Sequence, residues 1–332
     1  MLEPKYYWGE SLEKLIHEVR PAREALIEGF LYKKSAQMLF APDGAGKSLI
    51  VLQACIQGTV DAGRVFGEMY VPKGFNTLYI YAERSIDEVG ERLKRMTSKT
   101  PYDSQRFVVT ADLQDINLRD QKSFTSGLDR IKWIADQSMK QVDLVVLDPI
   151  YAMVRGGLKD DEGASYITEF SRLLQSHFGC SVLIVHHANR GTKDKESGKR
   201  IGEDMFGSRF LSAHCTGVYK LSLNADKTGT TLECEKSSAL NLEKKIELTY
   251  EPETDLSWIR HKDGSIAKID RLYNYLRTCK RQDKSFTFGS MIDNSGVSTS
   301  YLRVLVKDTL FKELKEVDKL KNGIILYKYL GA

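Results

Sequence analysis

The sequence predicts an α/β protein built on a mostly parallel sheet, with a small domain at its C-terminal end. Three observations lead to this class. Short apolar runs alternate with amphipathic stretches between about residues 34 and 188. A glycine-rich turn that ends in Gly-Lys-Ser follows the first apolar run. After residue 207 the β-type runs follow one another closely, and a basic segment closes the chain. Strand and helix patterns in this alternation are typical of a parallel sheet covered by helices.

The predicted parallel strands are rich in Val, Ile and Leu and are apolar on both faces, as buried strands are. They are the runs at 36–41, 76–82, 106–110, 142–148 and 180–187. The stretches between them carry apolar residues three and four positions apart, which predicts one buried stripe on each helix. These helices are expected around 86–96, 124–135 and 167–178.

The later strands are expected at 217–223, 230–236 and 244–250, as antiparallel strands that extend the same sheet. We expect three parts of the chain: an N-terminal segment, 1–30, that can clasp a neighbouring subunit, a nucleotide-binding domain, 31–260, and a C-terminal domain, 261–332. The last part has helical patterns followed by a hairpin that turns near Asn322-Gly323, which is the outline of a winged-helix domain.

Composition excludes several classes of protein. No run approaches the ~20 apolar residues of a membrane span, so we expect a soluble, cytoplasmic protein with no membrane partner. The five cysteines have no paired spacing, so we expect reduced and mostly buried thiols. The net charge of +4 comes from the C-terminal part, where residues 263–332 hold 13 Lys and Arg against 8 Asp and Glu.

The segment Ala41–Ser48 has the P-loop pattern, with Ala in place of its first Gly. Glycines at 44 and 46 let backbone N–H groups turn toward phosphate oxygens at the start of a helix. Lys47 is expected on the β- and γ-phosphates and Ser48 on Mg²⁺. The predicted nucleotide-binding residues are Asp43, Gly44, Ala45, Gly46, Lys47, Ser48 and Leu49.

Two carboxylates follow predicted strands and should reach the same edge of the sheet as the P-loop. Asp148 ends an apolar run and is expected to hold Mg²⁺ with Ser48, although Asp148-Pro149 is also compatible with a simple turn. Glu83 directly follows the run "LYIYA" and is the candidate base that orients the attacking water. The alternative is an ordinary surface pair between Glu83 and Arg84.

Together, "APDGAGKS", "LYIYAE", "VVLDPI" and "VLIVHHANRG" resemble the RecA-like ATPase core, in the branch of the hexameric replicative helicases of plasmid RepA type and, more distantly, DnaB type. The resemblance covers about residues 20–250. It implies a RecA-like P-loop NTPase fold that takes ATP and Mg²⁺. It also implies that His187 senses the γ-phosphate, whereas a histidine packed at a strand end is the alternative.

In that family, loops from this edge line a ring and contact single-stranded DNA. Here the two loops lie at 151–165 and 188–208, and both are rich in Gly and charge. A solvated loop without a ligand is the alternative, because acidic residues dilute the positive charge. The predicted DNA-binding residues in these loops are Arg155, Lys159, Arg190, Lys193, Lys199 and Arg200.

The resemblance further implies that a neighbouring subunit supplies a cation to the active site, for which Lys220 and Arg209 are the candidates. In the C-terminal domain, Arg303 and Lys307 are four residues apart on one helical face and suit contact with DNA. A small domain that makes oligomer contacts explains these residues almost as well.

The sequence therefore leads to a ring-forming, ATP-hydrolysing DNA helicase or translocase in the replication of a plasmid, phage or mobile element. Its expected partners are DNA, further copies of itself in a homo-hexamer, and an initiator or primase. Two alternatives remain. One is a DNA-binding RecA-like ATPase of recombination or repair that does not unwind, and the other is a regulatory module gated by nucleotide.

Overall fold

The computed structural model describes most of the nucleotide-binding domain and parts of the C-terminal domain. The described residues are 24–83, 85–111, 113–155, 161–188, 192–193, 200–201, 209–224, 228–237, 245–259, 272, 275–276, 279–280, 283–295, 302, 314–319 and 325–330. Residues 1–23 of the predicted N-terminal segment therefore lie outside the described residues.

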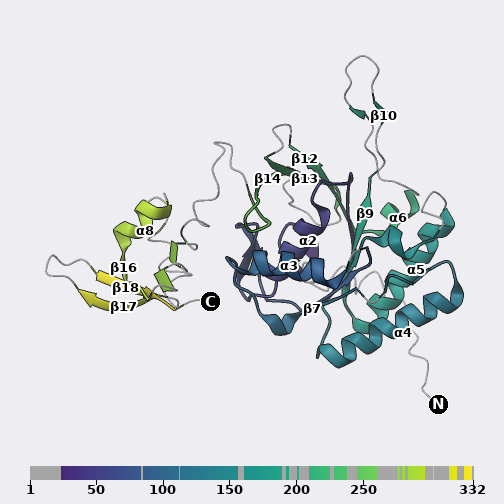
Figure 1. Ribbon diagram of the computed structural model, residues 1–332, viewed down its shortest axis with the longest axis horizontal. Coiled ribbons are helices and arrows are strands. Elements are labelled where there is room, and N and C mark those ends of the chain that lie inside the picture. Colours follow the sequence, from purple (N-terminus) through teal and green to yellow (C-terminus); the bar gives the residue numbers. More distant parts are fainter. Residues whose placement is uncertain are drawn as a thin grey trace, which may run out of the picture.

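A nine-stranded sheet, in the order β15-β14-β13-β12-β3-β9-β8-β6-β7, forms the centre of the first domain (Figure 1). Its strands are β3 (Ala36–Ala41), β6 (Thr77–Tyr81), β7 (Phe107–Thr110), β8 (Leu144–Asp148), β9 (Ser181–His187), β12 (Gly217–Leu223), β13 (Gly229–Ser237), β14 (Lys245–Glu251) and β15 (Leu256–Ile259). The five predicted parallel strands are confirmed, with ends that differ by at most two residues.

The expectation for the later strands was partly wrong. β12 is antiparallel to β13 but parallel to β3, because the chain crosses back over the sheet through α6 before β12 begins. From β13 onward the pairing is antiparallel, as expected. The sequence analysis also missed β15, a strand of only four residues.

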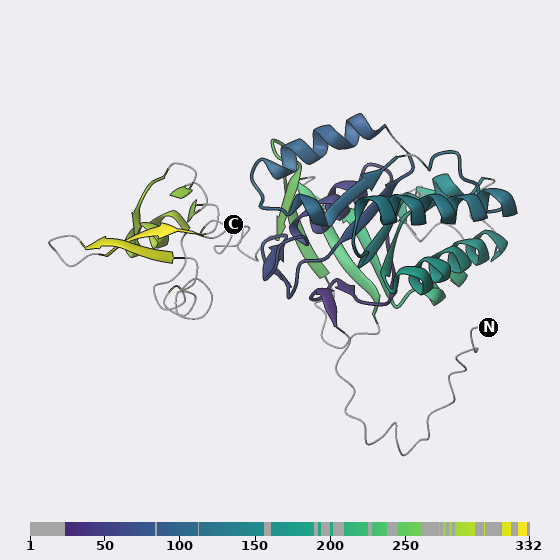
Figure 2. The same ribbon diagram turned by 90° about the horizontal axis from the view of Figure 1, so that it is seen from below.

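Helices cover both faces of the sheet (Figures 1 and 2). Their bounds are α2 (Lys47–Gln57), α3 (Ile86–Thr97), α4 (Gln121–Ser138), α5 (Asp161–Phe178) and α6 (Arg209–His214), with the short helices η1 (Ser104–Arg106) and η2 (Ile150–Met153). Apolar residues of α2 and α3 share one core with one face of the sheet, and those of α4, α5 and α6 share a second core with the other face. Alternation along the strands sends successive side chains into these two cores.

Three short antiparallel pairs complete the domain. They are β1 (Ala25–Ile27) with β2 (Leu31–Tyr32), β4 (Gly63–Val65) with β5 (Met69–Val71), and β10 (Thr192–Lys193) with β11 (Arg200–Ile201). Strands of two or three residues show no readable period, which is why the sequence did not reveal them.

The C-terminal domain has a core of its own. The described elements are β16 (Phe286–Thr287), α8 (Phe288–Ser295), β17 (Leu314–Lys319) and β18 (Ile325–Tyr329), and the sheet order is β16-β18-β17. The predicted hairpin is confirmed by the antiparallel β17–β18 pair, whose turn lies outside the described residues. The buried core residues are Leu272, Leu276, Cys279, Phe286, Met291, Leu302 and Tyr329. The winged-helix interpretation stays a prediction.

Two expectations from composition can be compared with the structure. All five cysteines are free, and four of them are buried, as expected. Within the described ranges, no helix has both the length and the apolar character needed to cross a bilayer.

Candidate functional site

The P-loop joins the end of β3 to the start of α2, as predicted. Gly44 and Gly46 have φ angles of 77° and 86°, in the left-handed region that residues with a Cβ rarely adopt. Gly46 is also the N-cap of α2, where the first N–H groups of the helix have no partner within it. The loop therefore presents backbone donors and the positive end of a helix at one point, which is the arrangement that binds phosphate.

The Lys47 side chain is folded back over this loop. Its Nζ donates to the carbonyl oxygens of Ala41 and Pro42 at 3.0 and 3.1 Å, and it lies 3.4 Å from Nδ1 of His187. Burial lowers the pKa of Lys47, and the charges of nearby carboxylates oppose this shift. Among the described residues, this buried ammonium group contacts carbonyl oxygens and an imidazole, and it is favourably placed to exchange them for anionic phosphate oxygens.

Asp148 ends β8 and is buried, with 1% of its surface exposed. The hydroxyl group of Tyr79 donates a hydrogen bond to it, and the Ser48 hydroxyl also favours its ionised form. Burial nevertheless raises the pKa of Asp148 to about 6, since these two hydroxyl groups only partly offset the loss of water. The carboxylate and the Ser48 hydroxyl are hard oxygen ligands at the P-loop, so the residues present fit Mg²⁺.

The register of the strands brings the other two predicted residues to the same edge. Tyr81 of β6 pairs with Asp148, and Ala41 of β3 pairs with His187. Side chains at alternate positions share one face of a strand, and Tyr79, Tyr81, Val146 and Val185 all lie in the core formed with α2. His187, the last residue of β9, and Glu83, two residues beyond β6, continue this alternation at the P-loop edge.

His187 contacts the P-loop directly. Its Nδ1 is paired with the carboxylate of Asp43, and burial together with the Lys47 charge lowers its pKa. Its Nε2 is buried and has no hydrogen-bond partner among the described residues. An imidazole with one nitrogen held by the P-loop and the other unpaired suits contact with a ligand in the same loop.

Glu83 is exposed just beyond β6, and its Oε1 accepts a hydrogen bond of 2.7 Å from the hydroxyl group of Tyr151. Arg84, the alternative partner from the sequence, lies outside the described residues. The sequence analysis missed Tyr151 and Tyr79 as members of the site. Tyr79 could have been found from the sequence, because it lies on the same face of its strand as Glu83. The contact between Tyr151 and Glu83 could not, because it depends on which strands are neighbours in the sheet.

The two candidate subunit-bridging residues lie on other elements than this cluster. Lys220 of β12 is paired in register with Phe40, whose side chain lies in the core on the other face of the sheet from α2. Arg209 begins α6. Both roles concern a neighbouring subunit and stay predictions.

The predicted DNA contacts are only partly described. Arg155 is exposed and follows η2 at the edge that carries Asp148. Lys193 and Arg200 are paired positions of the β10–β11 hairpin. The remaining predicted contacts lie outside the described residues: Lys159, Arg190, Lys199, Arg303 and Lys307.

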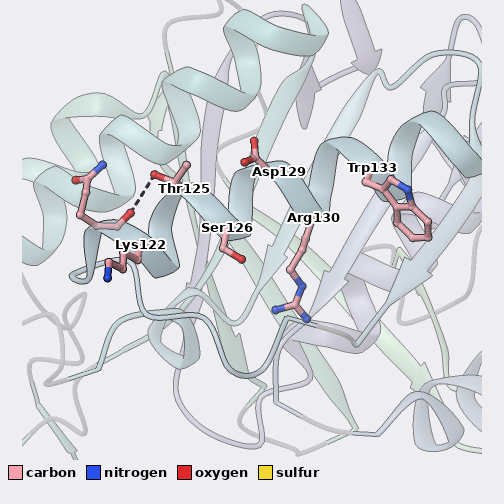
Figure 3. Close-up of a pocket in the computed structure, with 7 residues that line it drawn as sticks. Lys122, Thr125, Ser126, Asp129, Arg130 and Trp133 are labelled. Atoms are coloured by element: carbon pink, nitrogen blue, oxygen red, sulfur yellow. Dashed lines mark hydrogen bonds between the residues drawn. The ribbon is translucent and has the colours of Figure 1, made fainter.

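A separate hollow runs along the outer surface of α4 (Figure 3). All its lining residues belong to that helix: Gln121, Lys122, Thr125, Ser126, Asp129, Arg130 and Trp133. It includes no residue of the P-loop and neither Asp148 nor Glu83. We therefore assign the nucleotide site to the P-loop edge and not to this hollow.

Comparisons with known proteins agree with this assignment of the fold. A sequence profile of a family described as an AAA domain matches residues 10–193, which is more than half of the chain. The chain belongs to this AAA-domain family. No curated protein matches its sequence.

Solved structures of low sequence identity share the fold of the AAA-domain chain. A KaiC-like protein from the hyperthermophilic archaeon Pyrococcus horikoshii is 14% identical with a TM-score of 0.50, over 73% of this chain and 100% of that protein. A second solved structure, described as an ATPase domain, is 11% identical with a TM-score of 0.53, over 74% of this chain and 95% of that domain. The first domain thus shares its fold with these two proteins.

Proposed function

We propose that this protein hydrolyses ATP and uses the energy to move along DNA as a ring-forming helicase or translocase, in the replication of a plasmid, phage or other mobile element. One observation carries the hydrolysis: Asp148, Glu83 and His187 come from three neighbouring strands and gather at the edge that holds the P-loop. Nucleotide binding alone needs neither an acidic residue beyond the metal-binding carboxylate nor an imidazole.

Each residue of the cluster has a task in this proposal. The P-loop amides and Lys47 bind the phosphates, and Glu83 accepts a proton from the water that attacks the γ-phosphate. In this proposal the Nδ1–H of His187 donates to Asp43 and the Nε2–H donates to the γ-phosphate, which requires both ring nitrogens to carry a proton when ATP is bound. Ser48 and Asp148 would hold Mg²⁺, which supplies positive charge to the phosphate oxygens when bound.

Two features support a polyanionic partner. Arg155 is exposed on the segment that follows Asp148. Lys193 and Arg200 are paired positions of the antiparallel strands β10 and β11. We expect single-stranded DNA, bound mainly through its phosphates.

Ring formation belongs to the same proposal. In a homo-hexamer, Lys220 or Arg209 of one subunit would reach the γ-phosphate of the next and stabilise charge in the transition state. The C-terminal domain would contact DNA, an initiator or a primase. Native mass spectrometry with and without a non-hydrolysable ATP analogue tests this part, and a monomer under both conditions would overturn it.

Hydrolysis is tested by phosphate release from ATP and Mg²⁺, with and without single-stranded DNA. We expect DNA to stimulate the wild-type rate, Lys47→Ala to abolish nucleotide binding, and Glu83→Gln to bind nucleotide but lose hydrolysis by about a hundredfold. The matched control for the second variant is Glu88→Gln, since Glu88 is exposed in the first turn of α3. Equal rates for Glu83→Gln and wild type would remove Glu83 from the reaction.

Unwinding is tested separately, by strand displacement on a forked duplex, with Lys47→Ala as the inactive control. Displacement that needs ATP supports the helicase. DNA-stimulated hydrolysis without displacement would instead indicate a non-unwinding ATPase of recombination or repair. Nucleotide binding with no hydrolysis under any condition would indicate a nucleotide-gated regulatory module.

A further inference from the structure

Tyr151 contacts two of the residues to which we assign a part in hydrolysis. Its hydroxyl group donates to Oε1 of Glu83 at 2.7 Å. Its ring meets the His187 ring edge to face, with centroids 4.3 Å apart and an interplanar angle of 76°. One side chain therefore lies between the candidate base and the candidate γ-phosphate contact.

Strand order explains this position. In the sheet, β8 lies between β6, which precedes Glu83, and β9, which ends in His187. Tyr151 follows β8 by three residues, so it leaves the sheet between the two residues that it contacts. Neighbouring parallel strands are only about 5 Å apart, so a tyrosine there can contact the residues that follow both flanking strands.

The segment that carries Tyr151 is fixed on both sides. Asp148, before it, is paired within the sheet. After it, the carbonyl oxygen of Met153 accepts a hydrogen bond of 2.8 Å from the N–H of Leu118, and the N–H of Arg155 donates to Asn117 at 3.1 Å. Catalytic groups need supports that are themselves held in place, and Tyr151 meets this requirement.

The hydrogen bond also suits the chemistry of a base. A carboxylate has two oxygen atoms, so a hydroxyl group on Oε1 leaves Oε2 to accept a proton from water. Glu83 is exposed, and without this hydrogen bond its side chain would populate several rotamers. Burial and the Glu83 carboxylate raise the pKa of Tyr151, so that its hydroxyl group stays a donor at neutral pH.

We propose that Tyr151 is a positioning residue for Glu83: its hydroxyl group fixes the carboxylate in the orientation that accepts the proton of the attacking water. This inference rests on the proposed ATP hydrolysis and concerns the same site. Tyr151 does not touch the reacting atoms, so its loss should slow turnover and leave nucleotide affinity unchanged.

The test compares steady-state hydrolysis by wild type, Tyr151→Phe and Tyr250→Phe. The phenylalanine ring of the first variant can still pack on His187, so only the hydrogen bond is removed. Tyr250 is the matched control, because its hydroxyl group donates to the carboxylate of Asp255 at 2.6 Å, in the β14–β15 hairpin. We expect Tyr151→Phe to lower kcat about tenfold with KM within about twofold of wild type, and Tyr250→Phe to leave both constants unchanged.

A second comparison distinguishes positioning from a structural role. In a Glu83→Ala background, measured by single-turnover hydrolysis, Tyr151→Phe should have no further effect, because no carboxylate remains to be oriented. The same fractional loss in both backgrounds would overturn the inference, as would an unchanged kcat in the single variant. If the wild type itself does not hydrolyse ATP, the proposed function fails and the inference fails with it. If Glu83→Ala retains the wild-type rate, Glu83 is not the base and the inference alone fails. If only Tyr151→Phe is silent, the proposed function stands.

Discussion

The buried charge of Asp148 should make the ligand-free protein less stable than a variant with asparagine at this position. The side chain is 1% exposed, and burial raises its pKa to about 6 from the ordinary value of 3.8. In the unfolded chain the carboxyl group ionises at its ordinary pKa. The difference of about two pKa units, at about 1.4 kcal/mol per unit, makes the ionised form cost about 3 kcal/mol of folding free energy above pH 6.

The pH dependence follows from the direction of this shift. Because the folded-state pKa is raised, the contribution of Asp148 to stability is fully present below pH 3.8 and is lost as the pH rises through about 6. Asp148→Asn keeps the oxygen that accepts from Tyr79 but has no charge to bury. Relative to wild type, the variant should therefore gain about 2 kcal/mol in unfolding free energy between about pH 4.5 and pH 8.

Urea denaturation at these two pH values, with a chelator and without nucleotide, measures this change. Asp136→Asn is the control, since Asp136 is exposed on α4 and should show no such gain. The reasoning would be refuted if the free energies of unfolding of wild type and Asp148→Asn differed by the same amount at both pH values. It would also be refuted if the wild type became more stable relative to the variant as the pH rises.

Three further substitutions test the local structure around the site. Gly46→Ala should lower the unfolding free energy by about 1–2 kcal/mol and weaken binding of a fluorescent ATP analogue, since φ is 86° there; unchanged stability and affinity would contradict this. Tyr219→Phe should lower the midpoint of urea unfolding by an amount equivalent to about 1–2 kcal/mol, because the buried hydroxyl group of Tyr219 donates to the carbonyl of Phe30 at 2.6 Å. An unchanged midpoint would show that water replaces this hydrogen bond in the variant. Gln53→Ala should lower the free energy of unfolding by about 2–4 kcal/mol, because the Gln53 side chain hydrogen-bonds both the N–H and the carbonyl of Ser257. A loss below about 1 kcal/mol would show that these hydrogen bonds between α2 and β15 add little to stability.

Much of the first domain could be predicted because its signals are local. Continuous apolar runs predicted the parallel strands, and spacings of three and four predicted α3, α4 and α5. The P-loop could be read residue by residue, since its glycines, Lys47 and Ser48 act within one turn of chain. Glu83, Asp148 and His187 could be placed at one edge because the carboxyl ends of parallel strands meet there.

Contacts between distant segments could not be predicted in this way. Whether β12 runs parallel or antiparallel to β3 depends on the path of the chain through α6, which no periodicity encodes. Tyr79 and Asp148 are 69 residues apart, and Tyr151 and Glu83 are 68 apart, so their hydrogen bonds exist only once β6 and β8 lie side by side.

The sequence by itself thus determined which segments form strands and helices and which residues lie at the P-loop edge, since both depend on the order of residues along a few turns or one strand. Only the tertiary structure decided which side chains there share a hydrogen bond, how deeply Asp148 is buried, and that Tyr151 lies between Glu83 and His187. These properties depend on the order of strands across the sheet, which is set by the packing of the whole domain.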